Sequence, residues 1–222
     1  SAASDVYKRQ VERLAEMGMC FSNGYAPTAT CTGSRVSIQF GQTSARTQYR
    51  YVFDVYHKKQ RPNGYAGQYS LADSVKTAGK NYITAHFGKG MTEKLKMVNY
   101  DVTDEYEKYA PNGNLHGEKI DIPTRRELPP DNPKRIYSLI DESMKFLREN
   151  AGKRPFFMMV SHYSVHVPHA ASQKYMDKWK AKYDALEKPT EKEELRLFER
   201  ECNPLYGAML EETDQHIGII MD

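Results

Sequence analysis

The feature that most constrains how this chain folds is a continuous apolar run, Pro155-Phe156-Phe157-Met158-Met159-Val160. An apolar run without alternating polar positions is typical of a strand that is buried on both faces, as strands of parallel sheets are. A helical pattern precedes this run over 135–150, and helical patterns follow it at about 171–186, at 190–201 and from Asn203 onward. Strands that alternate with helices predict an α/β fold with a largely parallel sheet.

Earlier parts of the chain fit the same architecture. The pattern predicts a helix that ends at Gly18, a short strand over 19–25, and a helix whose first turn contains residue 32. Ser70 is expected to cap another helix, and residues 82–87 form a predicted strand. In the last helix, four apolar residues lie on one expected face: Leu205, Met209, Ile217 and Ile220.

Composition limits the classes of protein. The net charge is +3 with 27% charged residues, and no basic block is present, which argues against a nucleic-acid partner. No apolar run approaches the length that spans a membrane. The three cysteines, Cys20, Cys31 and Cys202, are too few and too scattered for a disulfide framework or for zinc-ligand spacing.

Both ends of the chain carry signs of interruption. Residues 1–10 include Asp5-Val6-Tyr7-Lys8-Arg9-Gln10, which resembles one reading frame of a transposase adapter used in sequencing libraries, so we expect a non-native leader. The chain stops at Met221-Asp222 inside an apolar periodic run, and we expect it to be an internal fragment. Between these ends, 11–222 is the expected domain, and within it 90–132 lacks periodicity and predicts a long surface insertion.

Reactive residues of α/β proteins collect just past the carboxyl ends of strands, and three segments occupy such positions. In the first, Cys31 lies near the start of a predicted helix, where free amide groups and the helix dipole favour an anion. Arg35 follows one turn later and is expected to reach the same end. The pair therefore suggests a cradle for sulfate or phosphate. A buried cysteine with a surface arginine is the alternative on these residues alone.

The other two segments follow the predicted strands 82–87 and 155–160. Lys89 comes after the first, where a lysine can donate to an anionic substrate; a solvated loop lysine is the alternative. Three histidines come after the second strand: His162, His166 and His169. An imidazole there can act as a general acid for a leaving oxygen. A metal site is the competing interpretation, but no carboxylate or fourth ligand has suitable local spacing.

Four motifs together resemble the type I sulfatase family. They are Cys31-x-x-Ser34-Arg35 after NGYAPTAT, then TAHFGK, then PFFMMVSHYSVHVPH and finally YGAMLEETDQHIG, in the order and approximate spacing of that family. The resemblance covers about Val11 to Asp222. It implies the alkaline-phosphatase-like α/β fold, a three-layer sandwich with a mostly parallel sheet, which would be incomplete at both ends of this chain. It identifies 11–222 as part of the N-terminal catalytic domain.

The resemblance also implies roles for individual residues. Cys31 would be oxidised to formylglycine, whose hydrate attacks sulfur and later expels sulfate. Arg35 would hold the formylglycine hydroxyls, and Lys89 would bind the sulfate. His166 would contact the sulfate ester and help to protonate the leaving group, and His169, from the same H-x-P-H pattern, is a further candidate for substrate binding.

The chain departs from the family pattern at two places. Gly33 stands where the family usually has a proline that belongs to the pattern read by the modifying enzyme. Gly90-Met91 follows Lys89 where Trp-His is usual, and His86 lies on the wrong side of Lys89 to match that histidine. The calcium ligands of the family lie in motifs outside this chain, so calcium is expected only in a full-length parent. Three aspartates are accordingly given no metal role: Asp101, Asp104 and Asp222.

Three functions remain open on the sequence. The leading one is hydrolysis of the sulfate ester of a sulfated small molecule or carbohydrate, with a formylglycine-generating or anaerobic maturating enzyme as partner. An inactive sulfatase-like member, favoured by the two departures, and a phosphatase or phosphodiesterase of the same superfamily are the alternatives. Family analogy places such enzymes in the periplasm or outside the cell, and no signal peptide is visible in the chain.

Overall fold

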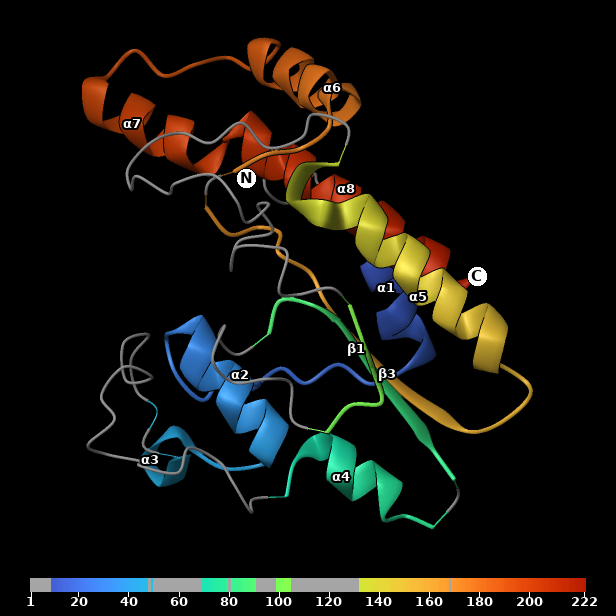
Figure 1. Ribbon diagram of the computed structural model, residues 1–222. Helices are drawn as coiled ribbons and strands as arrows, with labels where there is room; N and C mark the ends of the chain where they lie inside the picture. Colours follow the sequence, from blue (N-terminus) through green and yellow to red (C-terminus); the bar gives the residue numbers. More distant parts are fainter. Residues whose placement is uncertain are drawn as a thin grey trace, which may run out of the picture. The chain divides into compact units, whose positions relative to one another are not determined.

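The computed structural model of the chain describes residues 9–47, 49, 69–79, 81–90, 99–104, 132–167 and 169–222. These residues form two compact units, whose helices and strands are labelled in Figure 1. Unit 1 comprises the described residues of Ser1–Cys20, Asn112–Asp141 and His162–Asp222. Unit 2 comprises those of Phe21–Pro111 and Glu142–Ser161.

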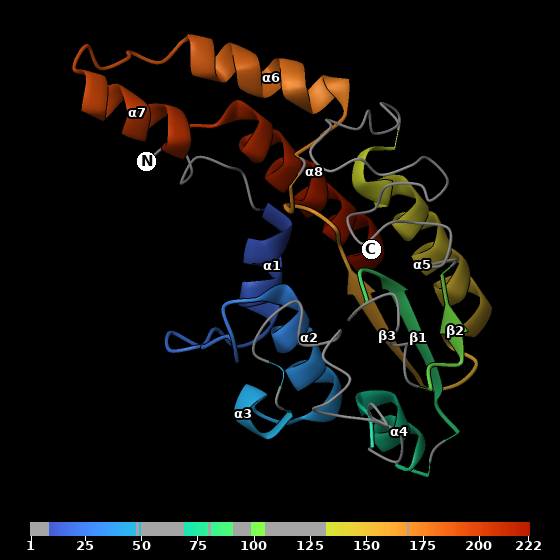
Figure 2. The same ribbon diagram turned by 60° about the vertical axis from the view of Figure 1, so that its left-hand side comes forward.

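Unit 2 contains a three-stranded sheet of order β2-β1-β3, made of β1 (Ile83–Gly88), β2 (Val102–Thr103) and β3 (Phe156–Ser161). Both pairs of neighbours are parallel, and Figure 2 shows the strands side by side. Ile83 lies opposite Phe156, and Gly88 lies opposite Ser161, so β1 and β3 end together. The predicted α/β fold with a parallel sheet is confirmed, and the segments that follow β1 and β3 leave the sheet at the same end.

Strand β3 is half-buried along Phe156–Val160, although its apolar run predicts burial on both faces. Within the described residues β3 lies at an edge of the sheet, where one side carries no neighbouring strand. Aromatic residues of β3 and β1 pack on α5 (Ile136–Asn150): the Phe146 ring of α5 lies 5.8 Å from the Phe156 ring of β3 and 6.0 Å from the Phe87 ring of β1. Helix α5 confirms the helix predicted over 135–150.

The other helices of unit 2 in the described residues are α2 (Cys31–Phe40), α3 (Ser44–Thr47) and α4 (Leu71–Lys76). Helix α2 ends at Gly41, whose φ of 59° is a left-handed conformation that glycine adopts without strain. Helix α4 begins with a capping box: the Ser70 hydroxyl accepts from the Asp73 amide (3.2 Å), and the Asp73 carboxylate accepts from the Ser70 amide (2.9 Å). The helices predicted near residues 32 and 70 are therefore confirmed.

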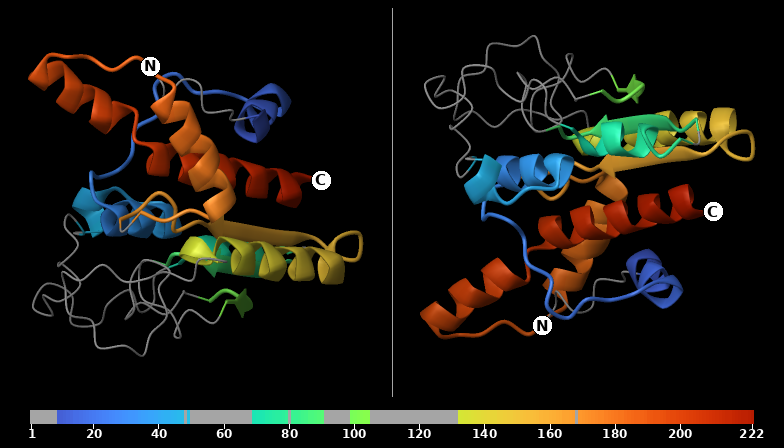
Figure 3. Two further views of the ribbon diagram at one scale, coloured as in Figure 1. Left: turned by 90° about the horizontal axis from the view of Figure 1, so that it is seen from above. Right: turned by 90° about the horizontal axis from the view of Figure 1, so that it is seen from below.

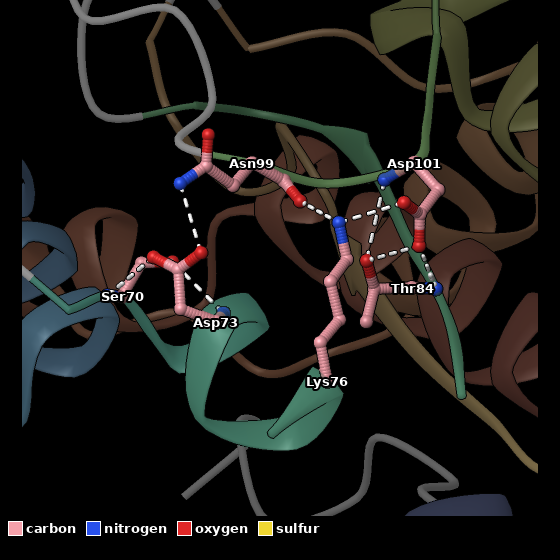
Figure 4. A network of polar contacts seen from close by, with 6 residues as sticks. All are labelled: Ser70, Asp73, Lys76, Thr84, Asn99 and Asp101. Carbon is pink, nitrogen blue, oxygen red and sulfur yellow. Dashed lines mark hydrogen bonds and ion pairs between the residues drawn. The ribbon is translucent and has the colours of Figure 1, made fainter. Parts of the chain in front are cut away.

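A polar network joins the start of β1 to α4 and to the segment before β2, and Figure 4 shows its members: Ser70, Asp73, Lys76, Thr84, Asn99 and Asp101. The Asp101 carboxylate accepts from the Thr84 amide (2.8 Å) and hydroxyl (2.9 Å) and pairs with the Lys76 ammonium (2.6 Å). Lys76 also donates to the Asn99 carbonyl. The predicted insertion 90–132 thus contains a strand held beside β1, and most of its remainder lies outside the described residues.

Unit 1 is helical in its described part, with α1 (Arg9–Met17), η4 (Pro133–Arg135), the first residues of α5, α6 (Gln173–Asp184), α7 (Lys192–Glu201) and α8 (Pro204–Met221). Helices α1 and α6 both pack on α8 (Figure 3). Asn203 caps α8 by accepting from the amides of Leu205 (3.0 Å) and Tyr206 (3.2 Å). The three helices predicted after residue 170 are confirmed.

The buried face of α8 includes polar residues beside the apolar ones that the sequence predicted on one face. Of the four apolar residues expected there, only Met209 is buried, while the others are half-buried: Leu205, Ile217 and Ile220. The buried positions include three carboxylates and a histidine: Glu211, Glu212, Asp214 and His216. Periodicity gave no sign of these buried polar residues, because it counts a carboxylate as a surface residue, whatever partners it meets in the folded chain.

Two of these carboxylates hold other segments on α8 through hydrogen bonds that offset their loss of water. Glu211 accepts from the indole of Trp179 at 2.7 Å. Glu212 accepts from the Tyr137 hydroxyl and from the Ser172 amide, each at 3.1 Å. The start of α5 and the start of α6 are therefore both joined to α8 by polar contacts.

The third carboxylate, Asp214, holds the start of α1. It accepts from the amides of Gln10 (3.2 Å) and Val11 (3.0 Å), as a capping residue does at a helix N-terminus. Helix α1 confirms the first predicted helix. Arg9 and Gln10 of the predicted leader belong to α1, while residues 1–8 lie outside the described residues, so the leader remains a prediction.

The strand predicted over 19–25 is wrong. This segment forms turns and irregular structure, and its large apolar side chains are exposed, with Met19 and Phe21 at 77% and Tyr25 at 89%. A strand requires a neighbour for its amide and carbonyl groups, which a short apolar pattern does not provide.

Gly207 on α8 lies so close to Trp179 that a Cβ atom at this position would be 2.5 Å from the indole carbon Cε3. We expect Gly207→Ala to lower the free energy of unfolding by about 1–3 kcal/mol, because the ring or the helix must move. Urea unfolding followed by the fluorescence of Trp179, the one tryptophan of the chain, measures this change. Ile219→Ala, at an exposed position of the same helix, should change it by less than about 0.5 kcal/mol. Equal stability of Gly207→Ala and wild type would contradict the close packing.

Candidate functional site

The candidate nucleophile lies at the N-terminus of a helix, as the sequence predicts. Cys31 is the first residue of α2 and is exposed, and Thr30 before it has extended backbone angles. The Thr30 side chain makes no capping hydrogen bond, so it does not occupy the first amide groups of α2. Amide groups and the helix dipole together favour an anion at this end.

Gly33, in the first turn of α2, has no room for a side chain. A Cβ atom there would lie 2.7 Å from the Thr28 hydroxyl and 2.9 Å from the Tyr49 carbonyl oxygen. The Thr28 hydroxyl accepts from the Thr30 amide (3.1 Å) and donates to the Thr30 carbonyl (2.9 Å). A proline, which the sulfatase pattern has at this position, would meet the same atoms. Glycine at this position and threonine at 28 therefore fit each other.

Arg35 and Lys89 lie close to Cys31. The Arg35 guanidinium donates to the Lys89 carbonyl oxygen at 2.8 Å. Lys89 is 8% exposed, and this burial lowers the pKa of its ammonium; a charge on Cys31 opposes the shift, and the charge of Arg35 adds to it. Three of the four residues predicted to converge are thus neighbours in unit 2, and two positive groups lie near the candidate nucleophile.

Three hydrogen bonds hold the main chain where β1 ends. The Gly88 amide donates to the Asp104 carboxylate at 3.1 Å. The Lys89 amide donates to the Ser161 carbonyl at 2.7 Å, and the Lys89 carbonyl accepts the bond from Arg35. Gly88 has a φ of 94°, which favours glycine. The sequence pattern left Asp104 and Ser161 without a role, although Asp104 follows β2 just as Lys89 follows β1.

Gln39 docks α2 on the sheet. It follows Arg35 by one turn, as Arg35 follows Cys31, so these three residues lie on one face of the helix. The Gln39 amide nitrogen donates to the Met159 sulfur (3.3 Å), and its oxygen accepts from the Tyr100 hydroxyl (3.0 Å). Gln39 is 3% exposed. The sequence did not predict the burial of Gln39, because the helical pattern gives no sign that a polar residue is buried.

His86 is a buried histidine on β1 that the sequence motifs did not single out. It is 1% exposed, its Nε2 lies 3.2 Å from the Ser161 hydroxyl, and its ring centre lies 5.5 Å from that of Tyr100. Burial lowers the pKa of His86 to about 4, and the positive charge of Arg35 lowers it as well. The imidazole is therefore neutral at physiological pH and lies close to the guanidinium.

The three histidines after β3 belong to unit 1 and differ from one another. His162 is largely buried, and this burial lowers its pKa to about 4; the pKa of His216 on α8 is also about 4, through burial and the charge of His162. The Nδ1 of His166 lies 2.6 Å from the Val167 carbonyl oxygen, and the ring of His169 contacts that of Tyr206 at 6.0 Å. The convergence of His166 with the residues of unit 2 remains a prediction, as does substrate binding by His169.

A family model described as sulfatase matches residues 4–222. The chain belongs to the sulfatase family. A search of curated proteins finds no significant match. The parallel sheet with its helices is consistent with the alkaline-phosphatase-like α/β fold of sulfatases, as the four sequence motifs implied.

Calcium, which sulfatases usually use, has no fitting set of ligands in the described part of this sulfatase-family chain. Calcium takes about six to eight oxygen ligands, and no group of three or more His, Cys, Asp or Glu among the described residues could hold a metal ion. The three aspartates without a metal role each have a protein partner: Asp101 bonds to Thr84 and Lys76, Asp104 to the Gly88 amide, and Asp222 to Arg13. We therefore assign no step to calcium.

None of the helices among the described residues combines the length and the apolarity that crossing a membrane requires.

We expect the stability of this sulfatase-family chain to fall as the pH is lowered from about 6.5 towards 4. The imidazole of His86 takes up a proton near pH 6.5 in the unfolded chain, but only near pH 4 in the folded chain. Protonation in this window therefore favours unfolding, and the stabilisation is complete above it. Protonation of His86 over this window lowers the free energy of unfolding by about 3 kcal/mol. Urea unfolding followed by circular dichroism at several pH values measures it.

Two substitutions on β1 serve as variant and control for the pH dependence. In His86→Phe the fall in stability between about pH 6.5 and 4 should be smaller by the contribution of one histidine. Thr84→Val, on the same strand, removes no titrating group and should shift stability nearly equally across this window, because the lowered pKa of its partner Asp101 lies below it. The same pH dependence in His86→Phe and wild type would show that the fold does not hold this imidazole neutral.

Proposed function

We propose that the chain forms the nucleophile-bearing part of a site that hydrolyses sulfate esters. The observation that carries this proposal is the grouping of Cys31, Arg35 and Lys89 at the N-terminus of α2 in a member of the sulfatase family. The oxygens of a sulfate ester carry negative charge, which two positive groups and a helix N-terminus stabilise. Family membership favours sulfate over other anions.

In this proposal Cys31 is converted to formylglycine, whose hydrate supplies the hydroxyl that attacks sulfur and a second hydroxyl that later expels sulfate. Arg35, one turn along α2, donates to those hydroxyls. Lys89 donates to the sulfate oxygens, and its burial strengthens this interaction because little water screens it. His166 gives a proton to the leaving alcohol oxygen, and His169 adds to substrate binding.

The proposal extends to substrate and partner. The substrate is a sulfated small molecule or a sulfated carbohydrate, and the partner is a formylglycine-generating or anaerobic maturating enzyme that acts on Cys31. The site of action is the periplasm or the outside of the cell. Membership of the sulfatase family supports these assignments.

An inactive member of the family is the second candidate. The observation that favours it is the packing of Gly33 against Thr28 and Tyr49, which leaves no room for the proline of the modification pattern. If the modifying enzyme needs that proline, Cys31 remains a thiol and the anion site lacks its nucleophile.

Conversion of Cys31 separates these candidates. We expect co-expression of the intact protein with a formylglycine-generating enzyme to produce the mass loss of conversion on the peptide that contains Cys31, and aryl sulfate turnover with it. Cys31→Ala should abolish both. An unconverted thiol without turnover would support the inactive member, and phosphodiester turnover above sulfate turnover would support a phosphodiesterase of the same superfamily.

Lys89 provides a test of the anion site itself. We expect Lys89→Met to lower kcat/KM for an aryl sulfate by about 10²–10³-fold, because a positive group that stabilises transition-state charge is lost. Conversion of Cys31, measured by mass spectrometry, should be unchanged. Lys180→Met removes an exposed lysine of α6 and should leave kcat/KM as in wild type. A wild-type kcat/KM in Lys89→Met would contradict the assignment of Lys89.

A further inference from the structure

We propose that His86 is a positioning residue of this site, which acts through Ser161 on Lys89 and across the packed face of α2 on Arg35. The proposal rests on the proposed function, because it concerns the same anion site. It adds a residue that the sequence motifs of the family did not mark.

The first link runs through Ser161. The Ser161 hydroxyl lies 3.2 Å from Nε2 of His86, and the carbonyl of the same residue accepts the Lys89 amide at 2.7 Å. Both His86 (1% exposed) and Ser161 (6%) are buried, so water does not compete for this contact. His86 therefore holds Ser161 at the end of β3, and Ser161 holds the main chain of Lys89.

The second link runs to α2. His86 lies beside Met159 in the register of β1 and β3, and Met159 accepts the hydrogen bond by which Gln39 docks α2. Arg35, one turn before Gln39, lies close enough for its charge to lower the pKa of His86. A neutral imidazole at this place adds no positive charge near the guanidinium. The guanidinium donates to the Lys89 carbonyl at 2.8 Å.

Packing alone does not explain a histidine at this position. Its Nδ1 is buried and has no hydrogen-bond partner among the described residues. A buried polar atom without a partner is unfavourable, whereas a phenylalanine would fill a similar volume without that penalty. What the histidine adds over phenylalanine is the contact of Nε2 with Ser161. Since the residue is 1% exposed, it acts through its neighbours and not on a substrate.

The test is the affinity of the intact protein for inorganic sulfate, measured by isothermal titration calorimetry with Cys31 as a thiol. We expect His86→Phe to raise the Kd about tenfold, which corresponds to about 1.4 kcal/mol. His86→Gln, whose amide nitrogen can occupy the place of Nε2, should restore most of the affinity. Ser161→Ala should weaken binding as His86→Phe does, and the double variant should be no weaker than either single variant, because both remove the same contact.

Thr84→Val is the matched control. Thr84 lies two residues before His86 on the same strand, is also fully buried, and belongs to the network at the opposite end of β1. Its substitution should lower thermal stability and leave the Kd for sulfate unchanged. An unchanged Kd in His86→Phe, or an equal loss of affinity in Thr84→Val, would overturn the positioning role alone. Absence of sulfate binding by the wild-type protein would count against the proposed function and overturn both.

Discussion

The burial of a positive side chain at the carboxyl end of β1 is the constraint around which unit 2 is arranged. Removing an ammonium from water is costly, and placing a guanidinium beside it adds repulsion. The Arg35 guanidinium keeps a hydrogen bond to the Lys89 carbonyl, and the main chain at the end of β1 is held by Ser161 and, through Gly88, by Asp104. An anion bound near the start of α2 would relieve the repulsion, which is consistent with the anionic substrate that we propose.

In unit 1 the central helix, α8, buries negative side chains where unit 2 buries positive ones. Glu211 accepts from α6, Glu212 from the starts of α5 and α6, and Asp214 from the start of α1, so one helix organises all three segments. These bonds are directional, which specifies how each segment lies on α8 more closely than apolar contacts would. Gly207 adds to this by admitting the Trp179 ring against the helix backbone.

Much of the fold and part of the candidate site follow from local sequence signals. The run from Pro155 to Val160, the helix after it and the Ser70 cap all depend on neighbours within a few residues, and the structure confirms them. Cys31 at a helix start and Lys89 after a strand were predictable for the same reason. The prediction of a strand over 19–25 was wrong because a strand also needs a neighbouring strand from a distant part of the chain. Among the described residues this segment pairs with no other strand.

The sequence by itself therefore determined the α/β class, most helix starts and ends, and membership of the sulfatase family. Only the tertiary structure decided which polar side chains are buried and what they do. His86 meets Ser161, which lies 75 residues further along the chain, and Glu211 meets Trp179 across 32 residues. The physical reason is that a buried polar group is stabilised by the donors and acceptors around it, and these come together only when distant segments pack.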